Sequence, residues 1–396
     1  MVGSVAGEKI SIKVVALAIS ATTSASLPVF LTGALSVQIR ASLGLGRAAT
    51  GFLVAVFFSS ATVSSLTTGG LSEKRKAESV MKYAAFFSAA GMLGIALFAH
   101  SFLTFALFLV ISGLANGVMQ PAVNTFVAGA IPATRQGLAF GVKQAAIPTA
   151  TMLAGLAVPA VALTIGWRYG YVFAAAIAVV VAAVLPKGKS IRSSTSPTNS
   201  TAVPISIPPL IMLAFAMALG AGAANAMGAY LVENAVHSGI APGSAGLLAA
   251  LGSASGLSAR LVSGYLADKR SGGHIRVAAM MVGIGAIGYL LFATQDAILL
   301  IPATLIGYGA GWGWNGLYNF AVVKNHPGAA GRATGITQSG AYVGSVIGPI
   351  GFGLIVQHVS FQFGWTLAAT SAILSSVFML FGRKMLIRDK NRVLPG

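Results

Sequence analysis

Twelve apolar stretches, each about 20 residues long, run through the sequence and leave little room for any other architecture. A helix needs about 20 apolar residues to cross the hydrocarbon core of a bilayer, because it rises only 1.5 Å per residue. Of the 396 residues, 56% are hydrophobic and 8% are charged, and the core of a water-soluble domain could not bury that much apolar surface. We therefore predict an all-α membrane protein with twelve transmembrane helices.

The predicted spans lie near residues 12–35, 49–68, 81–99, 102–126, 137–160, 165–185, 207–231, 244–265, 275–293, 298–322, 332–356 and 361–382. A polar segment rich in Ser and Pro separates the sixth span from the seventh, and such a composition is typical of a flexible linker. We predict an N-terminal six-helix bundle over residues 1–185, a cytoplasmic linker over 186–206, and a C-terminal six-helix bundle with a basic tail over 207–396.

The net charge of +18 is unevenly distributed along the chain. If the N-terminus is cytoplasmic, 20 of the 25 Lys and Arg fall on cytoplasmic segments, and only Arg40, Arg47 and Arg168 fall on the other side. This is the positive-inside bias, so we expect a multi-pass protein of the cell (inner or plasma) membrane with both termini in the cytoplasm. The basic clusters then contact anionic lipid, and we expect no nucleic-acid partner.

Cysteine is absent, which excludes disulfides, thiolate catalysis and Cys-ligated metals. The five His residues are scattered over predicted loops and helix ends, and no paired carboxylates or metal-ligand spacings accompany them. We therefore predict no catalytic residues, no metal site and no cofactor, and we do not expect an enzyme.

The two halves of the chain repeat each other. A shift of 194 residues superimposes Gln144 on Gln338, and a shift of 195 superimposes the turn at residues 69–73 on the turn at 264–268. Because each half has an even number of spans, the repeats run parallel across the membrane. Internal repeats of this kind are typical of transporters whose site lies between the halves.

These two turns resemble the signature of the major facilitator superfamily, Gly-x-Leu-x-Asp-Arg-x-Gly-Arg-Arg. The second turn is the better match, because the first has Glu73 in place of Asp and no glycine after Arg75. The resemblance covers nearly the whole chain and implies two pseudo-symmetric six-helix bundles that work by alternating access. It also implies a gating role for Gly69, Glu73, Arg75, Gly264, Asp268 and Arg270.

Two basic residues, Lys143 and Arg260, lie inside predicted spans. Lys143 follows Arg135 by eight residues and Arg260 precedes Asp268 by eight, so both lie about 12 Å above the cytoplasmic lip. An embedded cation costs roughly 2.5–3.5 kcal/mol, and all seven acidic residues can be placed in tails, turns or near the outer face. A substrate anion is the simplest compensating charge.

Arg260 also resembles the helix-8 arginine of monocarboxylate and oxalate carriers, and the pair Lys143-Gln144 before Pro148 is similar to helix 5 of cyanate-type permeases. Both resemblances imply a small carboxylate or other anion, held by Arg in bidentate fashion and by Lys as a point charge. The alternative for each cation is structural: Arg260 extends to the lip or clamps Asp268, and Lys143 extends toward the cytoplasm.

Polar residues on other spans extend the candidate substrate site. Together with Lys143 and Arg260 they are Gln144, Gln120, Asn116, Asn225, Asn315, Tyr318, Gln338 and Tyr342. Polar groups inside a membrane must find partners, so hydrogen bonding between helices is an equal alternative for each of them.

The leading hypothesis is a secondary active transporter that moves a small organic anion across the cell membrane as a monomer, with protons as the candidate coupling ion. The alternative is a proton-driven drug or multidrug efflux antiporter. Such antiporters usually need a carboxylate within the membrane, and Glu233 near the outer mouth is the one candidate in this sequence.

Overall fold

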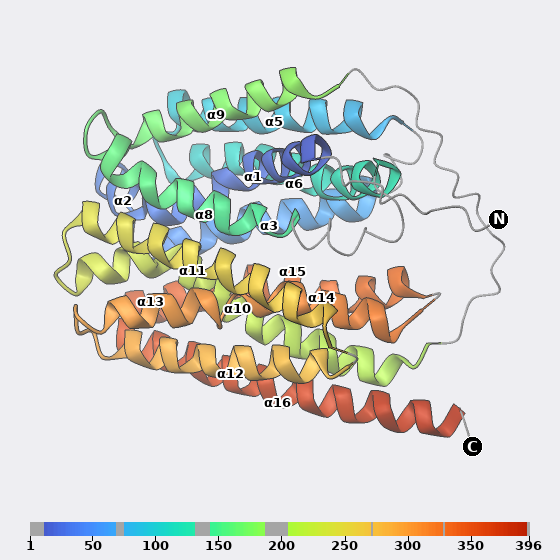
Figure 1. Ribbon diagram of the computed structural model, residues 1–396. Coiled ribbons are helices and arrows are strands. Elements are labelled where there is room, and N and C mark those ends of the chain that lie inside the picture. The colour runs from blue at the N-terminus through green and yellow to red at the C-terminus, as the bar shows by residue number, and fades with distance from the viewer. Residues whose placement is uncertain are drawn as a thin grey trace.

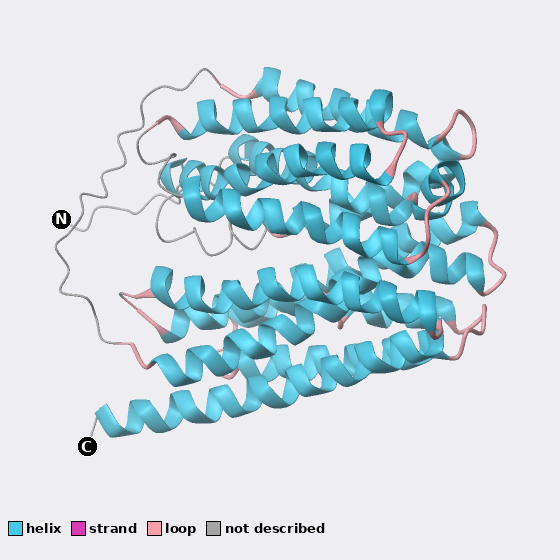
Figure 2. Cartoon of the chain, turned by 180° about the vertical axis from the view of Figure 1, so that it is seen from behind, coloured by secondary structure: helices cyan, strands magenta, loops and turns pink. Residues whose placement is uncertain are grey.

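The computed structural model describes residues 12–68, 75–130, 143–186, 205–270, 272–327 and 329–393, and these residues form helices and loops without any strand (Figure 2). In chain order the helices are α1 (Ile12–Ala34), α2 (Ser36–Leu43), α3 (Ala48–Thr68), α5 (Ala77–Phe98), α6 (Phe102–Ala130), α8 (Ala146–Ala157), the π-helical turn η2 (Val158–Ala162), α9 (Trp167–Val184), α10 (Ile207–His237), α11 (Pro242–Asp268), α12 (His274–Ala293), α13 (Leu300–Gly309), α14 (Trp314–Asn325), α15 (Ala330–His358) and α16 (Phe361–Val393).

The helices form two bundles that lie side by side (Figure 1). Helices α1 to α9 form the N-terminal half, and helices α10 to α16 form the C-terminal half. Within the described residues, ten helices are long and apolar enough to cross a membrane. The other two spans are α8 with η2 and α13 with α14, which confirms the predicted twelve-helix fold in two bundles. The bounds of the linker stay a prediction, because residues 187–204 lie outside the described part.

The tenth span is broken, whereas the sequence predicted one continuous helix over 298–322. Helix α13 ends at Gly309 and α14 begins at Trp314, with two further glycines between them. Glycine is a weak helix former, and here it also permits close packing, since a Cβ on Gly285 of α12 would run into Gly311. The Trp314 indole N–H donates to the Gly311 carbonyl at 2.9 Å. The break therefore leaves backbone carbonyls near the middle of the span available to side chains of other helices.

The two ends of the bundle differ in the elements that meet there. Helix α9 ends and α10 begins at the linker end, where α1 also begins and α16 ends (Figure 1). The opposite end, where α1 turns into α2 and α10 turns into α11, is called the far end. Helix pairs α3–α15, α8–α11 and α1–α10 pack across the seam between the halves.

The halves approach backbone to backbone along the far-end part of the seam. A Cβ on Gly33 of α1 would lie 2.7 Å from the Gly228 carbonyl of α10. A Cβ on Gly155 of α8 would lie 2.6 Å from the Gly246 carbonyl of α11. Small residues at helix interfaces are the usual route to such contacts in membrane proteins, so glycine at these positions brings the two halves together.

Candidate functional site

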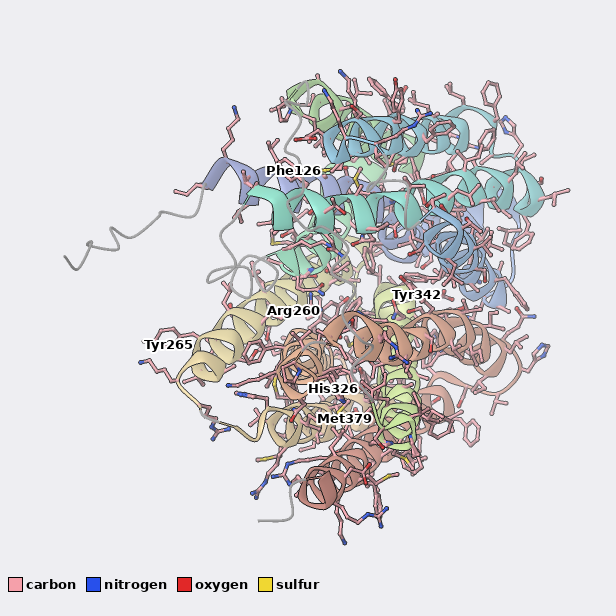
Figure 3. All side chains as sticks on the ribbon, turned by 90° about the vertical axis from the view of Figure 1, so that its right-hand side faces the viewer. Phe126, Arg260, Tyr265, His326, Tyr342 and Met379 are labelled. Carbon is pink, nitrogen blue, oxygen red and sulfur yellow. The ribbon has the colours of Figure 1, made fainter. Side chains whose placement is uncertain are left out.

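Arg260 lies on α11 at the seam between the two halves (Figure 3). One guanidinium nitrogen donates to the Gln144 carbonyl of the N-terminal half at 2.6 Å, and the other donates to the Trp312 carbonyl at 3.3 Å. The second contact depends on the break between α13 and α14, which frees that carbonyl. The third guanidinium nitrogen, Nε, is buried and has no hydrogen-bond partner among the described residues.

A small cavity of about 10 Å³ adjoins Arg260 and is called the seam cavity. Both halves line it, and its lining residues are Ile147, Pro148, Thr151, Gly256, Arg260, Tyr308 and Trp312. Because a buried donor without a partner is costly, the Nε of Arg260 marks this cavity as a place where a ligand acceptor would be stabilised.

A second cavity of about 10 Å³ shares the walls Thr151 and Tyr308 with the seam cavity and is called the Phe30 cavity. Its lining residues are Phe30, Ala34, Thr151, Gly228, Leu231, Val232, Ala249 and Tyr308. The Thr151 hydroxyl accepts a hydrogen bond from Ser253 of the opposite half at 2.8 Å. The two cavities therefore form neighbouring compartments of one region between the halves.

Lys143 is buried, at 7% exposure, next to the residue whose carbonyl binds Arg260. Its ammonium donates to Gln120 Oε1 at 3.0 Å and to Asn124 Oδ1 at 2.7 Å, both on α6. Lys143 thus lies one residue from the carbonyl that binds Arg260. Its amine is directed to amide oxygens of its own half, and Lys143 lines neither cavity. Within the described residues, neither cation forms an ion pair with a carboxylate.

The other predicted polar residues are held mainly by partners within their own half. Asn116 donates to Ser26 Oγ at 3.2 Å, and Asn225 donates to Ser345 Oγ at 3.0 Å and to the Ala221 carbonyl at 2.9 Å. Asn315 Oδ1 accepts from Asn319 at 3.0 Å, and the hydroxyl of Tyr318 donates to the Leu213 carbonyl at 2.8 Å.

Three other residues of the predicted substrate site have side chains without a hydrogen-bond partner among the described residues. The side chains of Gln144, Gln338 and Tyr342 are half-buried, and none of them forms a hydrogen bond within the described part of the chain. Tyr342 lies on α15 beside the seam (Figure 3). The backbone of Gln144, rather than its amide, makes the contact with Arg260.

The predicted gating turns lie at the linker end. Gly69 and Glu73 fall outside the described residues, and Arg75 is exposed before α5. Gly264 is exposed on α11, which ends at Asp268. Arg270 is also exposed, and its carbonyl accepts from Lys324 at 3.5 Å. The gating role of these turns stays a prediction.

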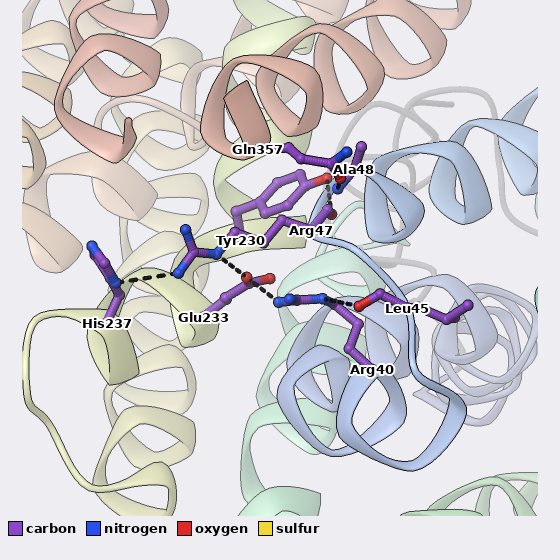
Figure 4. Close-up of polar contacts among 8 residues, drawn as sticks. All are labelled: Arg40, Leu45, Arg47, Ala48, Tyr230, Glu233, His237 and Gln357. Atoms are coloured by element: carbon purple, nitrogen blue, oxygen red, sulfur yellow. Dashed lines mark hydrogen bonds and ion pairs between the residues drawn. The ribbon is translucent and has the colours of Figure 1, made fainter. Parts of the chain in front are cut away.

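The sequence analysis missed an ion-pair cluster at the far end (Figure 4). Glu233 of α10, only 4% exposed, accepts from Arg40 of α2 and pairs with Arg47 of the α2–α3 turn at 3.3 Å. These contacts cross the seam. The sequence carried a partial signal, because Arg40 and Arg47 are two of the three exceptions to the positive-inside bias and Glu233 is a rare acid expected near the same, outer side of the membrane.

Further contacts across the seam surround this cluster. The Tyr230 hydroxyl donates to the Arg47 carbonyl at 3.2 Å, and the Ala48 amide donates to Gln357 Oε1 at 2.9 Å. The Arg47 guanidinium also lies over the ring of Phe361 at 5.4 Å. Charged, polar and cation–π contacts thus join the two halves at the far end.

Within the described residues, no group of three or more His, Asp or Glu side chains could hold a metal ion. The residues around Arg260 offer a ligand charge, hydrogen bonding and apolar contact.

Residues 14–269 and 210–393 match the Major Facilitator Superfamily. An uncharacterised MFS-type transporter found in two strains of Mycobacterium tuberculosis is 26% identical over 285 residues, or 68% of this chain. The chain spans 62% of the length of these curated relatives.

Two solved structures share the fold. A bacterial homolog of the human lysosomal transporter Spinster, in an inward-facing and occupied conformation, is 14% identical with a TM-score of 0.69, over 97% of this chain and 98% of that one. A D-xylose–proton symporter is 18% identical with a TM-score of 0.73, over 93% of this chain and 96% of that one. The fold and the sequence match over nearly the whole length agree that the chain belongs to the Major Facilitator Superfamily.

Proposed function

We propose that this protein is a secondary active transporter that moves a small organic anion across the cell membrane. The observation that carries the proposal is the guanidinium of Arg260, which lies at a cavity between the halves with a buried, unpartnered Nε. Two of its nitrogens are held by backbone carbonyls, which carry no net charge. A substrate carboxylate would supply both the missing acceptor and the missing negative charge.

Alternating access gives the far-end contacts a role in this proposal. With the linker end in the cytoplasm, as the basic residues favour, the pairs of Glu233 with Arg40 and Arg47 close the external side. Rocking of the two halves would break them and would also separate Arg260 from the Gln144 carbonyl. The contact that holds Arg260 in this state therefore changes during the cycle, and the substrate can take its place.

The seam cavity and the Phe30 cavity measure about 10 Å³ each, which is room for about one water molecule. Binding of any organic substrate at Arg260 therefore requires the two halves to move apart at the seam. The second candidate, proton-driven drug efflux, rests on Glu233, which is a buried carboxylate in a span. Its pairing with two arginines favours a role in closing the far end instead.

Substitution of Arg260 tests the proposal. In proteoliposomes we expect Arg260→Gln to weaken the affinity for a labelled carboxylate by about 10- to 100-fold, because a hydrogen bond to a charged group contributes about 1.5–3 kcal/mol. Arg260→Lys keeps the positive charge but loses the paired N–H donors of the guanidinium, so we expect an intermediate loss of affinity. Arg276→Gln, which removes an exposed arginine from the same half, is the matched control.

Thermal unfolding of each purified variant separates misfolding from a loss of binding. If Arg260→Gln folds and transports a carboxylate with unchanged affinity, the anion site is wrong. Uptake with and without an imposed pH gradient tests proton coupling, and indifference to the gradient would leave exchange or facilitated diffusion. A resistance phenotype that disappears in Glu233→Gln while carboxylate flux is absent would favour the efflux alternative.

A further inference from the structure

His237, the last residue of α10, contacts the same arginine that pairs with Glu233 (Figure 4). Its Nδ1 lies 3.4 Å from Nη2 of Arg47 across the seam, and its ring packs on Phe361 with the centroids 4.9 Å apart. The Arg47 guanidinium lies over that same ring at 5.4 Å. Arg47 therefore joins a carboxylate and an imidazole of the opposite half, and His237 belongs to the far-end closure.

The contact between His237 and Arg47 requires a neutral imidazole. A guanidinium can only donate hydrogen bonds, so Nδ1 of His237 has to be the acceptor and the ring proton has to sit on Nε2. A protonated imidazole is a donor at both nitrogens, and it would set a second positive charge against the guanidinium on the face of Phe361. The contact and a proton on His237 thus exclude each other.

A protonated His237 has another partner within its own helix. Glu233 lies four positions before it, one turn away on the same face, and an acid placed N-terminal to a cation at this spacing is stabilising. His237 also lies in the last turn of α10, where the partial negative charge of the helix end favours a cation. A pair inside the C-terminal half would therefore compete with the pair between Glu233 and Arg47 across the seam.

The other charged and titratable groups at this place are few. Arg40 and Arg47 stay charged at any physiological pH. His358, at the end of α15, is exposed and forms no hydrogen bond or ion pair within the described residues. Glu233 is the other titratable group, and a proton on its carboxylate would also release the arginines. Imidazole changes its charge between about pH 5 and 8, so His237 is the member of the closure suited to respond in that range.

We propose that His237 makes the far-end closure sensitive to pH: the neutral imidazole holds Arg47 across the seam, and a proton on it releases Arg47 and favours the open far end. Because the open state accepts this proton more readily than the closed state, its population rises as the pH falls. The inference rests on the alternating access of the proposed function and adds a regulator to it. His237 is exposed in the closed state, so the proton enters and leaves on the same, outer side and supplies no energy for transport.

Two contacts beside His237 do not depend on pH in this range. The amide of Ala48, the first residue of α3, donates to Gln357 Oε1 at 2.9 Å, and the hydroxyl of Tyr230 donates to the Arg47 carbonyl at 3.2 Å. Neither a glutamine nor a tyrosine changes its charge between about pH 5 and 8. Acid should therefore weaken the closure without abolishing it.

Spin-label distances test the pH response without any substrate. Ser42→Cys on α2 and Ala241→Cys before α11 place labels at exposed positions on either side of the seam, and the chain contains no native cysteine. Between about pH 8 and about pH 5.5, which spans the imidazole range, the ratio of long to short distances should rise about 5-fold. This is the lower end of typical coupling factors, because Arg47 and His237 are both partly exposed.

Two substitutions at His237 should act in opposite directions. His237→Gln stays neutral and keeps an acceptor, so it should show mainly short distances at both pH values. His237→Arg is charged throughout and should show the long distances already at about pH 8. His100→Gln, which removes another exposed far-end histidine, is the matched control and should keep the response. Gln357→Leu should lengthen the distances at both pH values and also keep the response, since the contact that it removes is neutral.

The outcomes for the switch and for the carrier can be told apart. Distances in the unmodified protein that ignore pH, or a full pH response retained in His237→Gln, would overturn the switch; in the second case Glu233 would be the titrating group. Neither result touches the carboxylate uptake that tests Arg260. An absence of carboxylate transport would instead overturn the proposed function, and the label distances would still decide whether His237 controls the far end.

Discussion

Glu233 of the C-terminal half accepts a hydrogen bond from Arg40 of the N-terminal half, although the two residues are 193 positions apart in the chain. The same carboxylate oxygen, Oε1, lies 3.3 Å from Nε of Arg47, whereas Oε2 is buried without a partner within the described residues. The two arginine side chains remain 21% and 37% exposed and the carboxylate 5%. One buried acid thus joins two partly solvated cations across the seam, and its removal should weaken the contact between the halves.

We predict that Glu233→Gln shifts the protein toward a state that is open at the far end. Loss of a charge-assisted hydrogen bond costs about 1.5–3 kcal/mol, which corresponds to roughly a 10- to 100-fold change in the ratio of the two states. Because the sequence contains no cysteine, spin labels can be attached through Ser42→Cys and Ala241→Cys, at exposed far-end positions on either side of the seam. The population with longer label-to-label distances should grow.

The matched control is Asp296→Asn. Asp296 is an exposed far-end acid that accepts from the backbone amide of Ile298 at 2.8 Å and makes no ion pair within the described residues. Its substitution should leave the distance distribution as it is. Equal distributions for the unmodified protein and Glu233→Gln would contradict a gating role for the ion-pair cluster.

Two glycines, one at the seam and one within the C-terminal half, allow an effect on the motion of the halves to be separated from an effect on folding. A Cβ on Gly51 of α3 would run into the Pro349 carbonyl of α15, across the seam, whereas a Cβ on Gly340 would run into the Ala214 carbonyl within the C-terminal half. We predict that Gly51→Ala lengthens the far-end distances with little loss of stability. Gly340→Ala should instead lower stability by about 1–3 kcal/mol, as overpacking does, measured by thermal unfolding. The reverse pattern would contradict the assignment of Gly51 to a moving interface.

Much of the fold can be predicted from the sequence because the membrane imposes a simple rule. Each span must be long and apolar enough to cross the bilayer, so hydropathy finds α1 and α16 alike. The break after Gly309 escaped the prediction, because glycine in a transmembrane helix does not by itself end the helix. Whether the helix ends depends on tertiary packing, here the approach of Gly285 to Gly311.

The candidate site could be predicted only in part. A cation in an apolar span is visible in the sequence, so Lys143 and Arg260 could be named. The partners of each cation could not, because the Gln144 and Trp312 carbonyls become available to Arg260 only once the chain is folded. The pairing of Glu233 with Arg40 is equally non-local, and no spacing in the sequence indicates it.

Tyr318 shows how the structure changes the expected role of a predicted site residue. It is fully buried, and its hydroxyl donates to the Leu213 carbonyl within the C-terminal half. We predict that Tyr318→Phe lowers the free energy of unfolding by about 0.5–1.5 kcal/mol, the contribution of one neutral hydrogen bond, and leaves carboxylate affinity unchanged. Calorimetric unfolding and equilibrium binding of the same labelled carboxylate would measure the two effects. A loss of carboxylate affinity without a loss of stability would show that Tyr318 contributes to the substrate site.

The environment of Lys143 allows a prediction about coupling between two helices. Its ammonium donates to Gln120 and Asn124 of α6, and removal of one acceptor leaves a buried charge with fewer partners. Gln120→Leu alone should therefore destabilise the protein by about 1.5–3 kcal/mol, but its cost should fall sharply in a Lys143→Met background. A double-mutant cycle of unfolding free energies isolates this coupling.

The matched control for that cycle is Asn116→Leu, on the same face of α6 one turn from Gln120. Asn116 donates to Ser26 and not to the ammonium, so its cost should be the same with Lys143 as with Met at that position. Additive effects in the Gln120 cycle would mean that Lys143 does not depend on this acceptor in the folded protein. The amine would then be free to reach the seam, and Lys143 would be a second candidate cation for the substrate.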